Sequence, residues 1–221
     1  MAVMTVDEKC EEYACTSHIM ENIAISKRGN EMLISKFDNN ESDINVEQLE
    51  NTYDMTLPDE YKKFLIKYNG GKTPETKFRI NGVSSDIQGF FGLGNAEESY
   101  HFDRFKNSVK IQEWLKCEIF PIAFNVFGDY IMIGVNGRSS KGIYFCYHDK
   151  PLQYIELAED FGSFINKCKS RKIGYIRSIE ERRNDMIKLG KGDKITPEKI
   201  AGWQAEIDEY ANIHQEELRI D

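Results

Sequence analysis

Two features of the sequence could support chemistry, and the first is the pair His148-Asp149. Such a pair could act in acid–base catalysis or bind a metal, but the other histidines, His18, His101 and His214, belong to unrelated segments. Metal sites need three or four convergent ligands, and acid–base catalysis needs a positioned partner. A turn at the end of a strand explains the pair better. We therefore expect no metal and no catalytic residue, and hence no enzyme.

The second feature is the glycine-rich run from Gly89 to Gly94, which reads G-F-F-G-L-G. It lacks the order G-x-G-x-x-G of dinucleotide-binding loops and the Lys-Ser/Thr pair of a P-loop. A strand with a bulge or a tight turn is the favoured interpretation. We expect no nucleotide or other cofactor.

The charge distribution indicates which kinds of partner the protein can bind. A formal net charge of −8 argues against general binding to nucleic acids or anionic membranes and favours a basic partner. Lys167 to Lys191 contains nine basic and three acidic residues (+6), whereas Glu198 to Asp221 contains seven acidic and two basic residues (−5). The basic run could grip nucleic acid, but pairing with its acidic sequel, within the molecule or between subunits, is favoured.

The sequence shows no pattern of a disulfide framework, a signal peptide or a membrane helix, and this bears on its expected cellular location. Its five cysteines are irregularly spaced and include no C-x-x-C pair, so neither a disulfide framework nor a zinc knuckle is indicated. The first 12 residues do not resemble a signal peptide, and no apolar run approaches the roughly 20 residues of a membrane helix. We expect a cytoplasmic protein.

The stretch from Leu57 to Gly71 is the best-defined helix in the sequence. Pro58 suits the first helical turn, and Asn69-Gly70-Gly71 can enter the left-handed region and end the helix. We expect Gly70 or Gly71 to have a positive φ. Apolar residues recur with helical spacing, which predicts a core-facing stripe of Leu57, Tyr61, Phe64, Leu65 and Tyr68.

After Gly71 the pattern changes to the alternation that is typical of strands. Turns rich in glycine and polar residues separate the strands and favour antiparallel hairpins. Helical spacing returns over Ala96 to Leu115, where we expect a surface helix, and over Phe161 to Cys168. The expected strands are Phe78 to Ile80, Ile87 to Leu93, Ile119 to Phe124, Asp129 to Val135, Gly142 to Tyr147 and Gln153 to Leu157.

Both ends of the chain extend beyond this region. Residues 1–40 allow an amphipathic helix with Val6, Cys10 and Tyr13 on one face, and 41–170 form the α+β domain, which begins with a short helix around Val46. Over residues 171–221, the opposite charges of the two segments predict a C-terminal appendage in which a basic and an acidic helix pack together. The acidic helix has Thr196 as N-cap and the apolar stripe Ile200, Trp203, Ile207, Ala211, His214 and Leu218.

Several short motifs recur in a fixed order from about Ile44 to Lys169, and together they resemble the SUKH superfamily. Its members include bacterial immunity proteins against polymorphic toxins and fungal cell-wall synthesis regulators of the Smi/Knr family. The motifs are Leu57-Pro58-Asp59-Glu60-Tyr61 with Phe64-Leu65, Asn69-Gly70-Gly71, Phe90-Phe91-Gly92-Leu93, Pro121-Ile122-Ala123 with Gly128-Asp129, Gly142-Ile143-Tyr144-Phe145 with His148-Asp149, and Phe161-Gly162-Ser163-Phe164-Ile165.

The resemblance implies an α+β fold, with a curved antiparallel sheet packed against helices. The first 40 residues and the C-terminal helical extension depart from the family pattern. It also implies a binding protein without shared catalytic residues. The expected function is immunity, by binding one cognate toxin domain such as a nuclease, and the alternative is a regulatory protein-interaction scaffold. The expected partner contacts lie on turns beside the sheet, at Asn69, Gly70, Gly71, Lys72, Gly128, Asp129, His148 and Asp149.

Overall fold

The computed structural model describes residues 31–38, 42–137, 141–150, 152–211 and 213–220. The amphipathic helix expected near Val6 to Tyr13 lies outside the described residues. The division into an N-terminal extension, a central domain and a C-terminal appendage stays a prediction.

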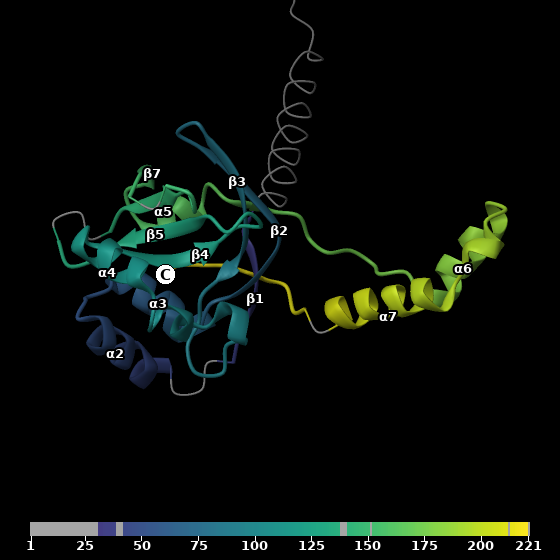
Figure 1. Ribbon diagram of the computed structural model, residues 1–221, viewed down its shortest axis with the longest axis horizontal. Coiled ribbons are helices and arrows are strands. Elements are labelled where there is room, and N and C mark those ends of the chain that lie inside the picture. The colour runs from purple at the N-terminus through teal and green to yellow at the C-terminus, as the bar shows by residue number, and fades with distance from the viewer. Residues whose placement is uncertain (1–30, 39–41, 138–140, 151, 212, 221) are drawn as a thin grey trace, which may run out of the picture.

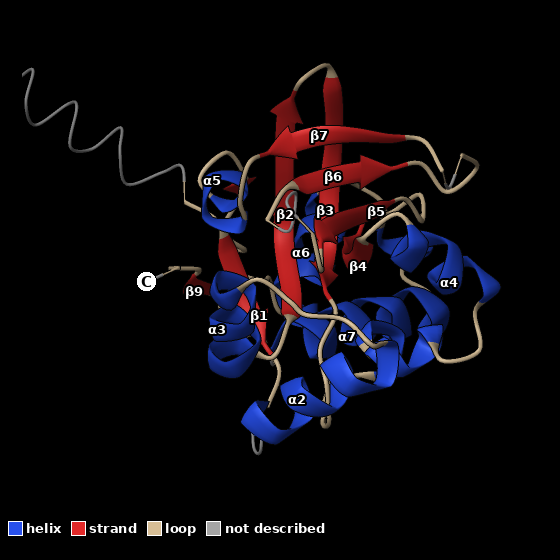
Figure 2. Cartoon of the chain, turned by 90° about the vertical axis from the view of Figure 1, so that its left-hand side faces the viewer, coloured by secondary structure: helices blue, strands red, loops and turns tan. Residues whose placement is uncertain are grey.

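The described residues form one antiparallel sheet of nine strands in the order β7-β6-β5-β4-β3-β2-β1-β9, with β8 paired to β2 (Figures 1 and 2). Together with the helices this gives the predicted α+β class. The strands are β1 (Leu33–Lys36), β2 (Gly71–Ile80), β3 (Val83–Phe90), β4 (Ile119–Phe124), β5 (Tyr130–Gly134), β6 (Ile143–Cys146), β7 (Tyr154–Ala158), β8 (Lys169–Ser170) and β9 (Glu216–Glu217).

The sheet is strongly curved. Register shifts interrupt the ladders between β2 and β3, between β4 and β5, and between β6 and β7, and bulges of this kind bend and twist a sheet. Asn81 and Gly82 both have positive φ and form the two-residue turn of the β2–β3 hairpin. The curvature brings this turn to β7, where Asn81 Nδ2 donates to the Glu156 carbonyl over 2.8 Å.

Helix α3 (Asp59–Tyr68) supplies the centre of the core, and the predicted stripe from Leu57 to Tyr68 is buried throughout. The Phe64 ring lies 5.1 Å from that of Phe90 on β3 and 5.0 Å from that of Phe161 on α5 (Phe161–Ile165). Helix α2 (Ser42–Tyr53) packs beside α3. Aromatic packing thus joins the expected central helix to both the sheet and the closing helix.

The chain leaves α3 through three consecutive residues with positive φ, Asn69 (52°), Gly70 (72°) and Gly71 (145°). This confirms the predicted left-handed helix end. The cap residue is Asn69, whose N–H donates to the Leu65 carbonyl over 2.8 Å. A Cβ on Gly70 would collide with the Phe91 carbonyl, so this position needs glycine for space as well as for φ.

The single helix expected over Ala96 to Leu115 is wrong. The segment forms two 3-10 turns, Glu98–Tyr100 and Phe102–Phe105, and the shorter helix α4 (Val109–Lys116). The reason is a tertiary contact that helical spacing does not encode, because Gly92 forms an isolated parallel bridge with His101 at the end of β3. An extended residue at His101 interrupts any continuous helix.

The C-terminal segment contains two helices, α6 (Ile179–Lys188) and α7 (Pro197–Ala211), as expected. The predicted stripe does not continue to Leu218, however, because α7 ends at Ala211. The chain then returns to the sheet, where β9 pairs with β1 and Leu218 is buried in the core.

Candidate partner-binding surface

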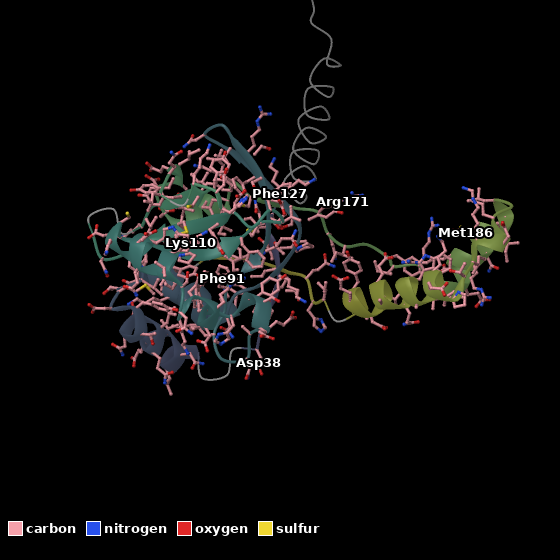
Figure 3. All side chains as sticks on the ribbon, viewed as in Figure 1. Asp38, Phe91, Lys110, Phe127, Arg171 and Met186 are labelled. Atoms are coloured by element: carbon pink, nitrogen blue, oxygen red, sulfur yellow. The ribbon has the colours of Figure 1, made fainter. Side chains whose placement is uncertain are left out.

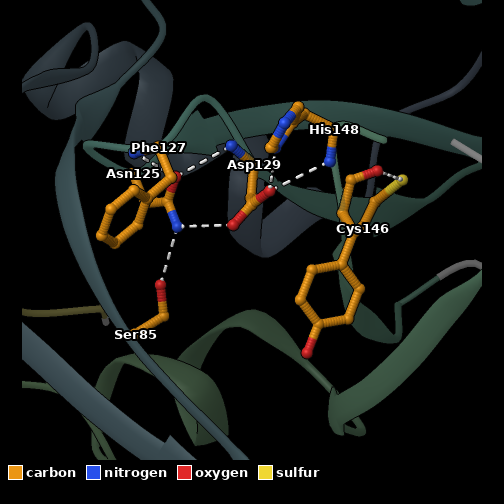
Figure 4. Close-up of polar contacts among 7 residues, drawn as sticks. Ser85, Asn125, Phe127, Asp129, Cys146 and His148 are labelled. Atoms are coloured by element: carbon orange, nitrogen blue, oxygen red, sulfur yellow. Dashed lines mark hydrogen bonds and ion pairs between the residues drawn. The ribbon is translucent and has the colours of Figure 1, made fainter. Parts of the chain in front are cut away.

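The turn between β4 and β5 is held by the buried side chain of Asn125 (Figure 4). Asn125 Oδ1 accepts hydrogen bonds from the backbone N–H groups of Phe127 (3.0 Å) and Asp129 (2.8 Å). Its Nδ2 donates to Ser85 Oγ and to Asp129 Oδ2, both over 2.9 Å. One amide therefore fixes both the shape of the turn and its attachment to β3.

Asp129 links this turn to the residue that follows β6. Its Oδ1 accepts hydrogen bonds from the His148 backbone N–H over 3.0 Å and from the His148 ring, with Nδ1 at 2.7 Å (Figure 4). Burial by itself would raise the pKa of the Asp129 carboxyl, but the hydrogen bonds from His148 and Asn125 outweigh it and hold this pKa below its ordinary value. Asp129 is thus a carboxylate at neutral pH, and the His148 ring that it orients is exposed.

The same turn displays large apolar side chains to solvent. Phe127 is 74% exposed and Val126 is 62% exposed, and the Val126 N–H donates to Asp86 Oδ2 over 3.3 Å. Figure 3 shows the position of Phe127.

The β6–β7 turn lies at the same end of the sheet, because Tyr130 pairs with Cys146, which pairs with Tyr154. We call the exposed residues of these two turns the turn surface: Val126, Phe127, Gly128, Tyr147, His148, Asp149 and Leu152.

The structure divides the predicted contact residues into two groups. Gly128 and Asp129 lie beside His148 and Asp149, although Asp129 is buried and acts through its hydrogen bonds. The other group, Asn69 to Lys72, lies elsewhere. Lys72 is two strands away, since it pairs with Gly89, which pairs with Phe124.

Within the second group, Asn69, Gly70 and Gly71 are buried and hold the core together rather than facing solvent. Lys72 is accessible, forms an ion pair with Glu97 at 2.8 Å and lies 5.8 Å from the centre of the Tyr100 ring. Only Lys72 of this group has a side chain that can reach a partner.

Asn125, Val126 and Phe127 were not among the predicted contact residues. A signal was present in N-V-F-G-D, because asparagine favours a turn closed by its own side chain and Gly128, with φ 83°, takes the left-handed position. The exposure of Phe127 has no such signal, since an aromatic residue next to a strand is more often buried.

Among the residues that the structure describes, the Asp129–His148 pair has no activated nucleophile beside it. The neighbouring thiol is that of Cys146, whose pKa is raised to about 11 by burial and by the Asp129 charge, so it is protonated at neutral pH. No group of three or more His, Cys, Asp or Glu side chains among the described residues could hold a metal ion. The geometry is therefore that of a hydrogen-bonded scaffold for exposed side chains.

The SMI1 / KNR4 family (SUKH-1) model matches residues 40–167, which is more than half of the chain. The chain therefore belongs to this family. Its fold agrees with the assignment, since the matched region contains six of the nine strands of the curved antiparallel sheet, β2 to β7, and the helices α2 to α5. The curated proteins contain no match to the chain. Over the part of the chain that the structure describes, none of the helices is both long and apolar enough to span a membrane.

Proposed function

We propose that this protein is an immunity protein that binds and neutralises one cognate toxin domain in the cytoplasm. Membership of a family whose members are often toxin immunity proteins supports the proposal. The observation that carries it is the turn surface, which presents the exposed Phe127 from a turn fixed by the Asn125 and Asp129 hydrogen bonds. Binding hot spots are commonly aromatic side chains of this kind, because a side chain that is already ordered loses little entropy on binding.

Inhibition by occupation needs no catalytic group on the inhibitor. It needs an anchor that enters a pocket, a surrounding polar rim and a favourable long-range field. The turn surface has an aromatic anchor, and His148 and Asp149 form part of its rim. The net charge of −8 would accelerate association with a basic toxin such as a nuclease, at a rate that falls with added salt.

The test begins with the neighbouring gene. A large secreted protein with a variable C-terminal toxin domain, encoded next to this one, supplies the toxin to be used. Co-expression of that toxin domain with the full chain is expected to protect cells and to give a stoichiometric complex on a size-exclusion column. Continued killing without a complex would contradict immunity and favour the regulatory scaffold.

The surface is tested with a matched pair of variants. Phe127→Ala is expected to weaken binding about 30-fold, which corresponds to a hot spot of about 2 kcal/mol. Ile44→Ala removes another exposed apolar side chain, on α2, and is expected to leave the affinity unchanged. Equal affinities for both variants would show that the toxin binds elsewhere, while protection by the parent protein would still support immunity.

A further inference from the structure

The helices α6 and α7 project from the sheet domain as a hairpin (Figures 1 and 3). Neither helix contains a buried residue, so the hairpin has no core of its own. A cleft of about 590 Å³ lies at its base, between α7 and the residues around Lys72 and Tyr100. The hairpin therefore stands away from the domain rather than covering it.

Helix α7 nevertheless carries an apolar stripe. Ile200, Trp203, Ile207 and Tyr210 follow one another at i, i+3, i+7 and i+10, the spacing by which helices pack in bundles, and all four are only half-buried. On the other helix Met186 is half-buried, while Ile187 is exposed. Two helices alone cannot enclose such a stripe, and a further layer of helix is needed to bury it.

Hydrogen bonds hold the two helices of the hairpin together and tie both of its connections to each other. Its two connections to the domain are tied together, because the Ile173 N–H donates to Gln215 Oε1 over 2.6 Å and Gln215 Nε2 donates to the Ile173 carbonyl over 3.1 Å. Between the helices, Arg182 binds both oxygens of Glu206, at 2.7 and 3.1 Å. The incompletely covered stripe therefore belongs to a fixed arrangement of two helices.

The two ends of the hairpin have net charges of opposite sign. The tip carries Lys188, Lys191, Lys194 and Lys199, which make no ion pair with other described residues, against two acids, Asp193 and Glu198, so its net charge is +2. The base carries six acids, Glu180, Glu181, Asp185, Glu206, Asp208 and Glu209, against Arg177, Arg182 and Arg183, so its net charge is −3. If a second hairpin lies antiparallel to the first, each basic tip meets the acidic base of the other. Such a surface is self-complementary, as an interface between two identical copies must be.

We infer that two copies of this protein dimerise through their α6–α7 hairpins, which pack antiparallel into a four-helix bundle. The stripes of the two α7 helices meet in the centre, and the tip lysines face the acidic bases at either end. This interface is separate from the turn surface, so dimerisation and toxin binding are tested independently.

The first experiment measures the mass of the full chain by light scattering across a range of concentrations. The expected result is a dimer of the 25.6 kDa chain. The double variant Trp203→Glu/Ile207→Glu is expected to be a monomer, whereas Ala205→Glu, which adds a charge at an exposed position of α7, remains a dimer. A parent protein that is monomeric at every concentration overturns the inference.

Charge exchange tests the antiparallel arrangement without depending on buried positions. In the tip variant, Lys188, Lys191 and Lys194 are each changed to Glu, and in the base variant Asp208 and Glu209 are each changed to Lys. Each variant alone places like charges together at both ends and is expected to raise the dimer Kd about tenfold or more. An equimolar mixture is expected to form a heterodimer, because both ends then pair opposite charges.

Recovery of the dimer in the mixture also shows that both variants are folded. If neither variant changes the mass of the dimer, the two copies associate through another surface and the inference is wrong. If the mixture stays monomeric while circular dichroism shows both variants to be as helical as the parent, the antiparallel arrangement is wrong.

Discussion

Asn69 and Leu93 exchange two hydrogen bonds, since the Leu93 N–H donates to Asn69 Oδ1 over 2.7 Å and Asn69 Nδ2 donates to the Leu93 carbonyl over 2.8 Å. The amide thus pairs with the backbone of Leu93 as a neighbouring strand would. Asn69 Nδ2 also donates to the Asp38 carbonyl over 2.6 Å. A single buried side chain therefore joins the end of α3 to the segments that follow β1 and β3.

Replacing Asn69 should be costly for two separable reasons. Asn69→Ala leaves the buried Leu93 N–H without a partner and places an alanine at φ 52°, so we expect a loss of about 3 kcal/mol or more in the free energy of unfolding. Asn69→Gly removes the same hydrogen bonds but tolerates this φ, and should cost about 1 kcal/mol less. Urea unfolding measures both. Equal losses would mean that the left-handed conformation carries no strain.

Gly70 and Gly82 separate backbone strain from lack of space. Both have positive φ, 72° and 82°, but a Cβ on Gly70 meets the Phe91 carbonyl, whereas a Cβ on Gly82 meets nothing within 4 Å. Gly82→Ala should therefore cost only the strain, about 1–2 kcal/mol. Gly70→Ala should cost clearly more, and Gly70→Val more again, as thermal or urea unfolding can show. If the two alanine variants are equally stable, the contact with Phe91 is not restrictive.

Tyr61 and Tyr68 lie on the same face of α3 but differ in their hydroxyl groups. Tyr61 Oη is buried without a hydrogen-bond partner among the described residues, whereas Tyr68 Oη accepts from the Arg219 N–H over 3.0 Å. Tyr61→Phe should leave the free energy of unfolding unchanged or raise it by about 1 kcal/mol, and Tyr68→Phe should lower it by about 1 kcal/mol. Destabilisation by Tyr61→Phe would reveal a partner for this hydroxyl.

The Asp129 carboxylate should make stability depend on pH. Its pKa is lower in the folded protein than its ordinary value of 3.8, so its contribution is complete above that value and is lost as the pH falls through the lower, folded-state pKa. In Asp129→Asn, one amide cannot accept both from His148 and from the Asn125 Nδ2 group, and we expect a loss of about 2 kcal/mol at neutral pH. The difference between parent and variant should shrink in urea titrations below pH 4. A difference that stays constant with pH would exclude a role for the charge.

The local sequence pattern was sufficient to predict much of the fold. The stripe of α3, the left-handed residues after Tyr68 and the strands β4 to β7 all depend on neighbours in sequence, and the structure confirms them. The failures involve distant contacts. The Gly92–His101 bridge interrupts the expected helix, and the pairing of β9 with β1 joins segments about 180 residues apart, which no local spacing records.

The candidate site was predictable only as a set of turns. The sequence placed Gly128-Asp129 and His148-Asp149 at strand ends, but the register of β5 and β6 decides that Asp129 and His148 meet at 2.7 Å. Likewise, Asn69 to Gly71 were expected on the surface, and packing against Phe91 and Leu93 buries them. Exposure depends on what other segments cover, and this is a property of the assembled fold.

The hydrogen bonds between Ile173 and Gln215 give the C-terminal helices the topology of an insertion rather than a tail. The chain departs after β8 and comes back at the same place to add β9 to the sheet, so entry and exit points are adjacent. An insertion with adjacent ends can be excised, exchanged or lengthened without changing the path of the host domain. Evolution can therefore vary the hairpin independently of the sheet, whereas a stop codon anywhere within it also deletes an edge strand.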